Sequence, residues 1–537
     1  MGQSSANDWK HSPVVQEQLR ERGIGVSEIE AQLERFRTGF PRIQLVRPCT
    51  PGDGIRQLTP EEEDHFITRY EAAMAQGRAM KFVPASGAAT RMFRDLQQIL
   101  THYDRYVDSI QNKPEAQWEE SLQPLRRFVD NLHRFAFYEA LQEVLRRAGQ
   151  DLAAILRRKD YRTLLTYLLT EKGLNYGQLP KALILFHRAN HRARTPIEEH
   201  LVEGRHHVRD AQGNVRLHFT VPVAYQESIA RFVQQVQPEY EQDGVRFHID
   251  YSTQNPALDL IAVDFHNRPI RDASGRLVFR PGGHGALLEN LNALKGDIVF
   301  IKNIDNVVPD AFKDPVVRYK KVLGGILVAV QQQIFDFLNR LEAGQLVEAD
   351  FVRIEQVLKE WMFEPFPDDY SSWSLEQRKA YLRQRLDRPL RVCGMVKNEG
   401  EPGGGPFWVK GRDGSLSLQI VEQAQVDTRD AEQQRIWEQS THFNPTDLVC
   451  GVRNFKGQPF DLMRFRDPET GFITVKYLEG QEVRVMELPG LWNGSMAFWN
   501  SIFVEVPLET FNPVKTVFDL LRPRHLGATA DTDDSAG

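Results

Sequence analysis

The strongest constraint on the fold is a regular alternation of short apolar stretches and amphipathic stretches between residues 178 and 306. The apolar stretches have strand length, and the amphipathic ones have helical spacing with capping residues at their starts. The strand-like stretches are "KALILFH" (181–187), "VRLHFTV" (215–221), "VRFHIDYS" (245–252) and "GDIVFIKNIDN" (296–306). This alternation predicts βαβ units, and therefore an α/β protein with a mostly parallel sheet and helices on both faces.

The rest of the chain divides into segments of different character. Residues 1–78 read as a helical N-terminal extension and 79–390 as the α/β core, which is interrupted by a helical insertion at 96–172. Residues 391–523 are rich in strand patterns and glycine turns, and we expect this β-rich part to complete the core. The composition of residues 524–537 is typical of a disordered tail.

Composition excludes several classes of protein. The formal net charge of −6 argues against a protein that binds nucleic acid through bulk positive charge. Cys49, Cys393 and Cys450 are far apart and fit neither a disulfide framework nor a metal site, so we expect a reducing compartment such as the cytoplasm. The longest apolar run, residues 322–330, is too short to span a bilayer, so no membrane association is expected.

The stretch "KFVPASGAATRMF" (81–93) predicts a strand, a loop of small residues and the start of a helix. Small residues let backbone N–H groups approach a ligand closely, and a helix N-terminus adds partial positive charge, which suits a phosphate group. Arg91 at the loop exit would add a bidentate donor. The predicted nucleotide-binding residues of the loop are Ser86, Gly87, Ala88 and Thr90. The alternative is a tight turn with Arg91 in a structural salt bridge.

Three further places carry residues suited to phosphate and metal chemistry. Lys181 follows a proline just before a predicted strand, where its ammonium group can reach a phosphate. Gly282, Gly283 and Gly285 form a turn that allows close approach of a flat ligand or a phosphate. Asp305 lies just beyond an apolar strand, at the edge where open α/β sheets bind ligands, and a carboxylate facing phosphates there would hold Mg²⁺.

Taken in order, these motifs resemble the sugar-phosphate nucleotidyltransferases, and most closely their uridine-diphosphate-sugar pyrophosphorylase branch. That family's G-x-G-T-R loop is matched by 87–91 with Ala89 in place of the second glycine, and its P-K pair by Pro180 and Lys181. Its P-G-G-x-G turn is matched by 281–285, and its metal-binding aspartate by Asp305. The resemblance covers residues 79 to about 430. The whole chain is also similar to an uncharacterised bacterial family known only as a domain of unknown function.

The resemblance implies a glycosyltransferase-A-like Rossmann core and a Mg²⁺-dependent transfer of a nucleotidyl group from a nucleoside triphosphate to a sugar 1-phosphate. Arg91 and Lys181 would bind phosphates as catalytic residues, and Asp305 would hold the metal. Asp427 and Asp447 are candidates for a second metal ligand, with Asp427 taken as the prediction. The resemblance leaves the base, the sugar and the oligomeric state open.

Two departures and two alternatives stand beside this prediction. The methyl group of Ala89 would crowd a triphosphate, and the helical insertion separates Arg91 from Lys181, which are close in sequence in the family. The alternatives are a non-catalytic nucleotide- or sugar-binding protein on the same fold, and a glycosyltransferase, which would want an Asp-x-Asp motif. The aromatic stretch "ELPGLWNGSMAFWNSIFVEV" (487–506) fits either packing at a sheet edge or a sugar-facing surface.

Overall fold

The computed structural model describes residues 8–87, 89–189, 192–400, 403–478 and 481–527. The chain forms two compact units, and each is built from three separate stretches of sequence. The first comprises Met1–Phe82, Ser252–Ile301 and Lys320–Leu508, and the second Val83–Tyr251, Lys302–Tyr319 and Glu509–Gly537. The units therefore cut across the segments expected from sequence, because the N-terminal and β-rich stretches share a unit with part of the predicted core.

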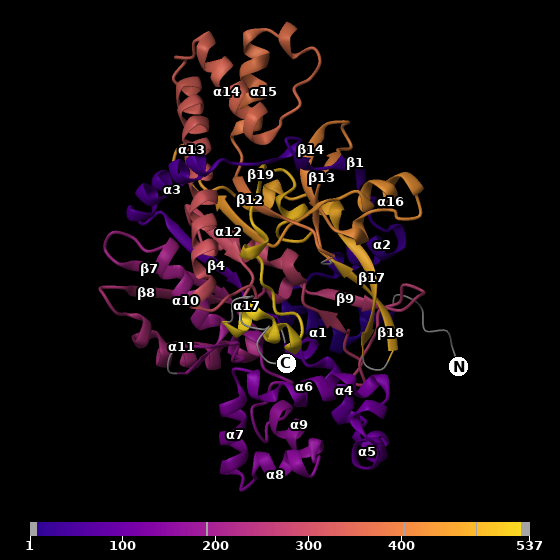
Figure 1. Ribbon diagram of the computed structural model, residues 1–537. Helices are drawn as coiled ribbons and strands as arrows, with labels where there is room; N and C mark the ends of the chain where they lie inside the picture. Colours follow the sequence, from indigo (N-terminus) through magenta and orange to yellow (C-terminus); the bar gives the residue numbers. More distant parts are fainter. Residues whose placement is uncertain (1–7, 88, 190–191, 401–402, 479–480, 528–537) are drawn as a thin grey trace. The chain divides into compact units, whose positions relative to one another are not determined.

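The first unit is built on a sheet in the order β2-β3-β19-β12-β16-β11-β4. Strands β4, β12 and β19 of this sheet are labelled in Figure 1. The strands are β2 (Thr50–Pro51), β3 (Gly54–Arg56), β4 (Ala79–Pro84), β11 (Ile298–Lys302), β12 (Leu390–Lys397), β16 (Asp447–Gly451) and β19 (Asn500–Glu505). The β2–β3, β3–β19, β19–β12 and β11–β4 pairs are parallel, whereas β12–β16 is antiparallel. Every residue of β11 is buried, as expected for a parallel strand covered on both faces. The predicted mostly parallel α/β sheet is confirmed.

Two smaller antiparallel sheets complete the strands of this unit. One has the order β1-β13-β14 and the other β10-β9-β18-β17, while β15 pairs with β12. Their bounds are β1 (Gln44–Pro48), β9 (Leu260–Val263), β10 (Phe279–Arg280), β13 (Gly405–Lys410), β14 (Leu416–Val421), β15 (His442–Phe443), β17 (Phe472–Leu478) and β18 (Gln481–Glu487). Strands β12 to β19 all lie from residue 390 onward, so this part of the chain is rich in strands.

The predicted helical character of residues 1–78 is only partly right. Helices form over α1 (Pro13–Arg22), α2 (Val26–Thr38) and α3 (Pro60–Ala75), and α3 begins with the capping box expected at Thr59. Residues 44–56 instead form β1, β2 and β3. The reason is non-local: β1 pairs with β13 and β3 with β19, both far along the chain.

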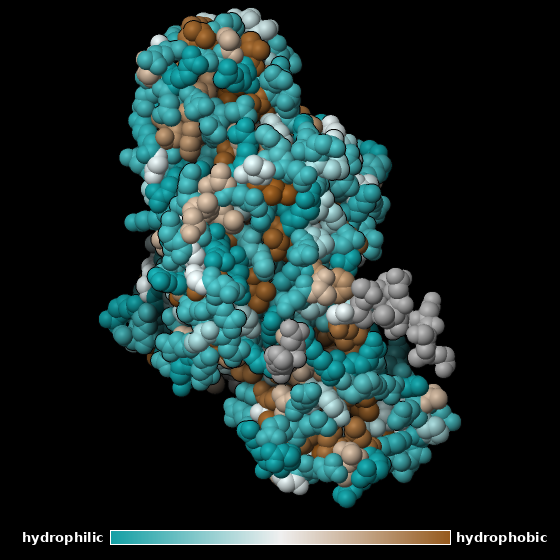
Figure 2. All heavy atoms as spheres, turned by 60° about the vertical axis from the view of Figure 1, so that its left-hand side comes forward, coloured by the Kyte–Doolittle hydropathy of each residue, from teal (hydrophilic) through white to brown (hydrophobic). Residues whose placement is uncertain are grey.

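The remaining helices of the first unit are α12 (Leu287–Ala293), α14 (Glu348–Met362), α15 (Leu375–Leu386) and α16 (Ala431–Glu438). The long helix α13 (Lys313–Glu342) contains the apolar run at 322–330. Within the described residues one helical stretch, Asp310–Glu342, is long and apolar enough to cross a membrane. Of its most apolar window 61% is buried inside the protein, so packing in the core accounts for its apolar composition. The face seen in Figure 2 is mostly hydrophilic.

The second unit combines a helical block with a small α/β part. The block contains α4 (Arg94–Thr101), α5 (Tyr103–Asn112), α6 (Gln123–Asp130), α7 (Tyr138–Arg147), α8 (Leu152–Arg157) and α9 (Tyr161–Leu169). The other elements are β5 (His187–Arg188), β6 (Ala193–Arg194), α10 (Pro196–His207), β7 (Asn214–Thr220), α11 (Gln226–Tyr240), β8 (Arg246–Ser252) and α17 (Pro523–Leu526). The strand expected at 181–187 is wrong: a 3-10 turn occupies Lys181–Leu183, and β5 holds only two residues.

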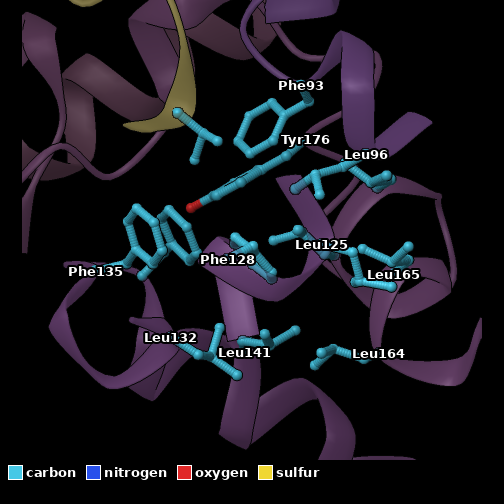
Figure 3. Packing of buried hydrophobic residues seen from close by; sticks show 14 of the residues in the cluster. Phe93, Leu96, Leu125, Phe128, Leu132, Phe135, Leu141, Leu164, Leu165 and Tyr176 are labelled. Atoms are coloured by element: carbon cyan, nitrogen blue, oxygen red, sulfur yellow. The ribbon is translucent and has the colours of Figure 1, made fainter. Parts of the chain in front are cut away.

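The helical block packs around an apolar core, to which Val307, Val514 and Leu520 also contribute, and aromatic side chains gather in it (Figure 3). Phe135 stacks on Phe128 at a ring-centroid distance of 5.3 Å and on Phe137 at 4.9 Å. Tyr176, from the chain that leaves the block, meets Phe137 edge to face. Residues 96–172 are all described, form helices and turns and contribute no strand.

We predict that Phe135→Ala destabilises the second unit by about 3–5 kcal/mol, because it removes a fully buried ring between two stacked partners. Urea unfolding, followed by far-ultraviolet circular dichroism, measures the shift of the transition. Val107→Ala on α5 is the matched control, since this side chain is 40% exposed. Equal midpoints for the two variants would contradict this account of the core.

Candidate functional site

Three chain segments meet at the carboxyl end of β4 in the second unit. The N–H of Ala85 donates to the carbonyl oxygen of Thr220, the last residue of β7, at 2.9 Å. On the other side the N–H of Ile304, just beyond β11, donates to the carbonyl oxygen of Pro84 at 3.1 Å. The loop that follows β4 therefore starts between the ends of two other strands, which is the edge where open α/β sheets bind ligands.

The small-residue loop leaves backbone donors available at this edge. Ser86 is half-buried and Gly87 exposed, and in the described chain their N–H groups have no hydrogen-bond partner. A Cβ atom added to Gly87 would meet open space, and the residue does not adopt a left-handed backbone. Neither packing nor the backbone conformation therefore requires a glycine at position 87. Close approach of a ligand to the backbone would require one. Thr90 is exposed, and Ala88 lies outside the described residues.

The loop is bonded directly to the segment that carries Lys181. The N–H of Lys181 donates to the carbonyl oxygen of Gly87 at 3.2 Å, and the N–H of Ala89 donates to that of Leu179 at 3.1 Å. The two ends of the helical insertion therefore lie side by side at the edge of the sheet. The long sequence separation, which weakened the prediction for Lys181, does not separate this residue from the loop in space.

Lys181 and Asp305 form an ion pair. Nζ of Lys181 donates to Oδ2 of Asp305 at 2.6 Å and to the carbonyl oxygen of Val514 at 2.7 Å. The N–H of Val514 donates in turn to the carbonyl oxygen of Asp305 at 3.1 Å. The two charged side chains are 11% and 21% exposed, so the pair is largely shielded from water. Two of the predicted site residues are therefore in direct contact.

Arg91 is exposed and makes no ion pair with a carboxylate in the described part of the chain. The alternative of a structural salt bridge therefore finds no support, and nearby Asp95 makes no ion pair with Arg91 among the described residues. Arg91 lies in the 3-10 turn Ala89–Arg91, whose first residue is bonded to Leu179. Its guanidinium group is available to an anion.

Buried polar atoms without partners mark the same edge and were missed from sequence. Oγ1 of Thr220, Oδ1 of Asn303 and Nδ2 of Asn306 are all buried and find no hydrogen-bond partner among the described residues. Such an atom costs about 1–3 kcal/mol unless water or a ligand supplies a hydrogen bond. The only sequence signal was the polar tip "KNIDN" that follows an apolar strand.

The candidate metal ligands differ in what their oxygens already contact. Asp305 keeps Oδ1 without a partner among the described residues, so it can offer one oxygen to a Mg²⁺ ion whose other ligands are substrate phosphates and water. Both oxygens of Asp427 accept from its neighbour Arg429, which holds the pKa of that carboxyl below its usual value. Asp447, the other candidate, is buried in the first unit in an ion pair with Lys320.

The described residues contain no group of three or more His, Cys, Asp or Glu side chains arranged to hold a metal ion. The residues thus fit a metal that arrives with a nucleotide and takes one oxygen from Asp305, and they do not fit a cage made by the protein alone. The metal role of Asp427 stays a prediction that its local contacts do not support.

The glycine-rich turn in the first unit is packed against the protein's own chain. A Cβ atom on Gly282 would lie 2.7 Å from the carbonyl oxygen of Leu258, and one on Gly285 would lie 2.5 Å from that of Pro489. Gly283 has φ of 66° and more space around it. The close approach that Gly282 and Gly285 permit is therefore made by neighbouring backbone, which explains these glycines without a ligand.

The aromatic stretch at 487–506 packs beside this turn. The ring of Trp492 lies 4.6 Å from that of His284 between centroids, and Trp492 is 8% exposed. Asn493 donates to Oε1 of Glu422, and the hydroxyl of Ser495 donates to the carbonyl oxygen of Pro489. These contacts favour the packing interpretation of this stretch over a sugar-facing surface.

A protein-family model matches residues 13–526, and its description is "Domain of unknown function (DUF4301)". The chain belongs to this family. The similarity to a family of unknown function that was inferred from sequence is thereby confirmed. No protein with a curated description matches the sequence.

The solved structures to which this DUF4301 protein is similar include pyrophosphorylases of uridine-diphosphate sugars. UDP-glucose pyrophosphorylase from Leishmania major is 12% identical, with a TM-score of 0.43, covering 98% of this chain and 80% of that one. The UDP-glucose phosphorylase from Trypanosoma brucei is 14% identical, with a TM-score of 0.45 and coverages of 95% and 78%. The uridine diphosphate N-acetylglucosamine pyrophosphorylase from Trypanosoma brucei is 12% identical, with a TM-score of 0.48 and coverages of 96% and 80%.

We predict energetic coupling between Lys181 and Asp305 of about 1.5–3 kcal/mol, the range for hydrogen bonds to charged groups. A double-mutant cycle of Lys181→Met and Asp305→Asn, measured by urea unfolding, gives this value. The exposed pair Arg429 and Asp427 is the matched control, for which the same cycle should give no measurable coupling. Additive effects of Lys181→Met and Asp305→Asn would contradict the shielded ion pair.

Proposed function

We propose that this protein is a nucleotidyltransferase that transfers a nucleotidyl group from a nucleoside triphosphate to a sugar 1-phosphate and releases pyrophosphate. The observation that carries the proposal is the convergence of an open loop of backbone donors with the Lys181–Asp305 pair at one sheet edge. Backbone N–H groups, an ammonium group and an exposed guanidinium group are the donors that phosphates need.

The reaction needs no covalent intermediate with the protein. An oxygen of the sugar phosphate attacks the α-phosphorus, and the bond from this phosphorus to the oxygen that bridges it to the β-phosphorus breaks. The electron pair leaves with pyrophosphate. Catalysis of such a transfer depends on holding two anions together and on neutralising the charge that develops.

Each residue of the edge has a part in this scheme. The N–H groups of Ser86 and Gly87 would bind phosphate oxygens, together with the exposed Arg91. Lys181, with two of its three ammonium hydrogens donated to Asp305 and Val514, keeps one for a phosphate. Oδ1 of Asp305 would hold a Mg²⁺ ion brought by the nucleotide, and the ion would supply charge neutralisation at the α-phosphate.

A first experiment tests the reaction itself. The purified protein is incubated with each of the four common nucleoside triphosphates, a panel of sugar 1-phosphates and Mg²⁺, and pyrophosphate release is followed. Release that requires both substrates supports the proposal. Nucleotide binding without release for any pair would favour the alternative, a non-catalytic nucleotide- or sugar-binding protein. That alternative is favoured by one observation: Asp305 already accepts a hydrogen bond from Lys181 with one of its two carboxylate oxygens.

We expect Asp305→Asn to abolish Mg²⁺-dependent turnover while the protein stays folded, since the amide keeps the shape of the carboxylate. Pyrophosphate release and the thermal unfolding midpoint measure the two effects. Asp427→Asn is the matched control, and we expect its turnover to stay near wild type because Arg429 already occupies both oxygens. Near wild-type turnover of Asp305→Asn would remove the metal assignment.

We expect Arg91→Ala to weaken nucleoside triphosphate binding roughly 10- to 150-fold, which corresponds to about 1.5–3 kcal/mol for a charge-assisted contact. Stability should change little, because the side chain is exposed and unpaired in the described chain. Calorimetric titration with Mg²⁺ present gives the affinity. Arg94→Ala, at an exposed neighbour on α4, controls for the loss of one positive charge. Equal loss of affinity in the two variants would show that net charge, and not a specific contact of Arg91, accounts for the effect.

A further inference from the structure

A second place in the same unit has the features of a ligand site, and it shares no residue with the loop, Lys181 or Asp305. It is a cavity of about 190 Å³, the space of about six water molecules. Its polar side chains are Arg134, Arg188 and His525, and the rest of its wall is apolar, with Phe186 and Leu520 among the residues. The cavity therefore combines positive charge with an apolar surface.

The two arginines lack carboxylate partners in the described part of the chain. Nη1 of Arg134 donates to Oδ1 of Asn131 at 3.0 Å. Nη2 of Arg188 donates to the carbonyl oxygens of His133 and Phe135 at 2.5 and 3.3 Å. These neutral acceptors orient both guanidinium groups but leave their charges uncompensated. An anion in the cavity would compensate them.

Behind the cavity runs a buried chain of hydrogen bonds. Glu199 forms an ion pair with Lys313 and contacts Nδ1 of His187 through Oε1 at 3.1 Å. Nε2 of His187 contacts Nδ1 of His525 at 2.9 Å. Glu199, His187 and His525 are 1%, 0% and 3% exposed, so water does not compete for these bonds. His525 is the member that lines the cavity.

The chain fixes which nitrogen of each ring carries the proton. The ionised Glu199, paired with Lys313, only accepts, so Nδ1 of His187 must be its donor. Nε2 of a neutral His187 is then an acceptor, and Nδ1 of His525 must donate to it. This leaves Nε2 of His525 as an unprotonated acceptor, and no hydrogen bond to it is found among the described residues.

Burial, more than the neighbouring charges, favours the neutral form of both rings. Burial is the main cause that lowers the pKa of His525 well below its usual value, and His187 and Arg522 lower it further. Burial also lowers the pKa of His187, with Lys313 and Arg194 acting in the same direction and Glu199 against it. Arg134 and Arg188 add positive charge on the cavity side.

A ligand for this cavity needs two properties. It must carry negative charge to pair with the arginines. It must also present an O–H donor to Nε2 of His525, because an oxyanion without a proton would place its lone pairs against the lone pair of that nitrogen. A phosphate monoester satisfies both, since its second pKa is about 6 and its monoanion keeps one acidic proton. We propose that this cavity binds a small phosphate monoester in its protonated, singly charged form.

The test compares ethyl phosphate with ethyl sulfate by calorimetric titration of the whole protein at pH 7. The two ions have nearly the same shape, but ethyl sulfate carries one negative charge and no proton. We expect ethyl phosphate to bind at least tenfold more tightly. Equal affinities would overturn the proposal, since attraction by the arginines alone would then account for binding.

The pH dependence gives a second, independent measurement. Above pH 6 free ethyl phosphate has lost its second proton, so formation of the protonated complex takes up one proton. We therefore expect affinity to fall about tenfold from pH 7 to pH 8. Titration in buffers of different ionisation enthalpy counts the proton directly. An affinity that does not change with pH, or no proton uptake, would overturn the proposal.

Variants assign the binding to this cavity rather than to the proposed nucleotide site. His525→Asn keeps a donor toward His187 and removes Nε2, so it should lose the preference for phosphate over sulfate. Arg188→Gln should weaken both ions at least tenfold, whereas Arg231→Gln on the exposed face of α11 should change neither. Unchanged ethyl phosphate binding in Arg188→Gln would overturn the proposal. If His525→Asn fails to fold, the wild-type comparisons still decide.

Discussion

The ion pair between Lys181 and Asp305 connects three parts of the second unit that are far apart in sequence. Lys181 stands where the chain returns from the helical insertion, Asp305 follows β11, and Val514 belongs to the C-terminal stretch. Removing two charges from water is costly, and such a pair adds little stability unless further hydrogen bonds satisfy it. Here the backbone of Val514 forms hydrogen bonds with both residues. These bonds fix the geometry of the ion pair even if the pair contributes little to the free energy of folding.

The helical insertion is compatible with this arrangement because its two ends lie side by side. The backbone bonds between Gly87 and Lys181 and between Ala89 and Leu179 close it at the base. Closing a longer loop costs only about 0.6 kcal/mol per doubling of length, and the insertion buries its apolar side chains in the core around Phe135. A large helical block can therefore stand between two site residues without disturbing either of them.

Much of the fold could be predicted because its signals are local. The alternation of strands and helices, the capping boxes at Thr59 and Thr195 and the helical periodicity of 96–172 each depend on residues a few positions apart. Strands β1 and β3 could not be predicted, because they pair with β13 and β19, more than 340 positions later. Likewise, nothing in the sequence near Asp447 indicates that Lys320 neutralises it.

The proposed nucleotide site and the cavity at His525 also differ in whether their signals in the sequence are local. Arg91, Lys181 and Asp305 each follow a recognisable local pattern, so the sequence singled them out, although only the structure brings Lys181 onto Asp305. His187 and His525 lie 338 positions apart and fit no motif. Their role follows from the direction of their hydrogen bonds. Because the carboxylate of Glu199 can only accept, it determines which ring nitrogen of His187, and then of His525, carries the proton. Burial excludes water, which would otherwise compete for these hydrogen bonds and disturb the arrangement of protons. The cavity therefore combines an acceptor nitrogen of His525 with two arginines, and it can select an anion by its proton as well as by its charge.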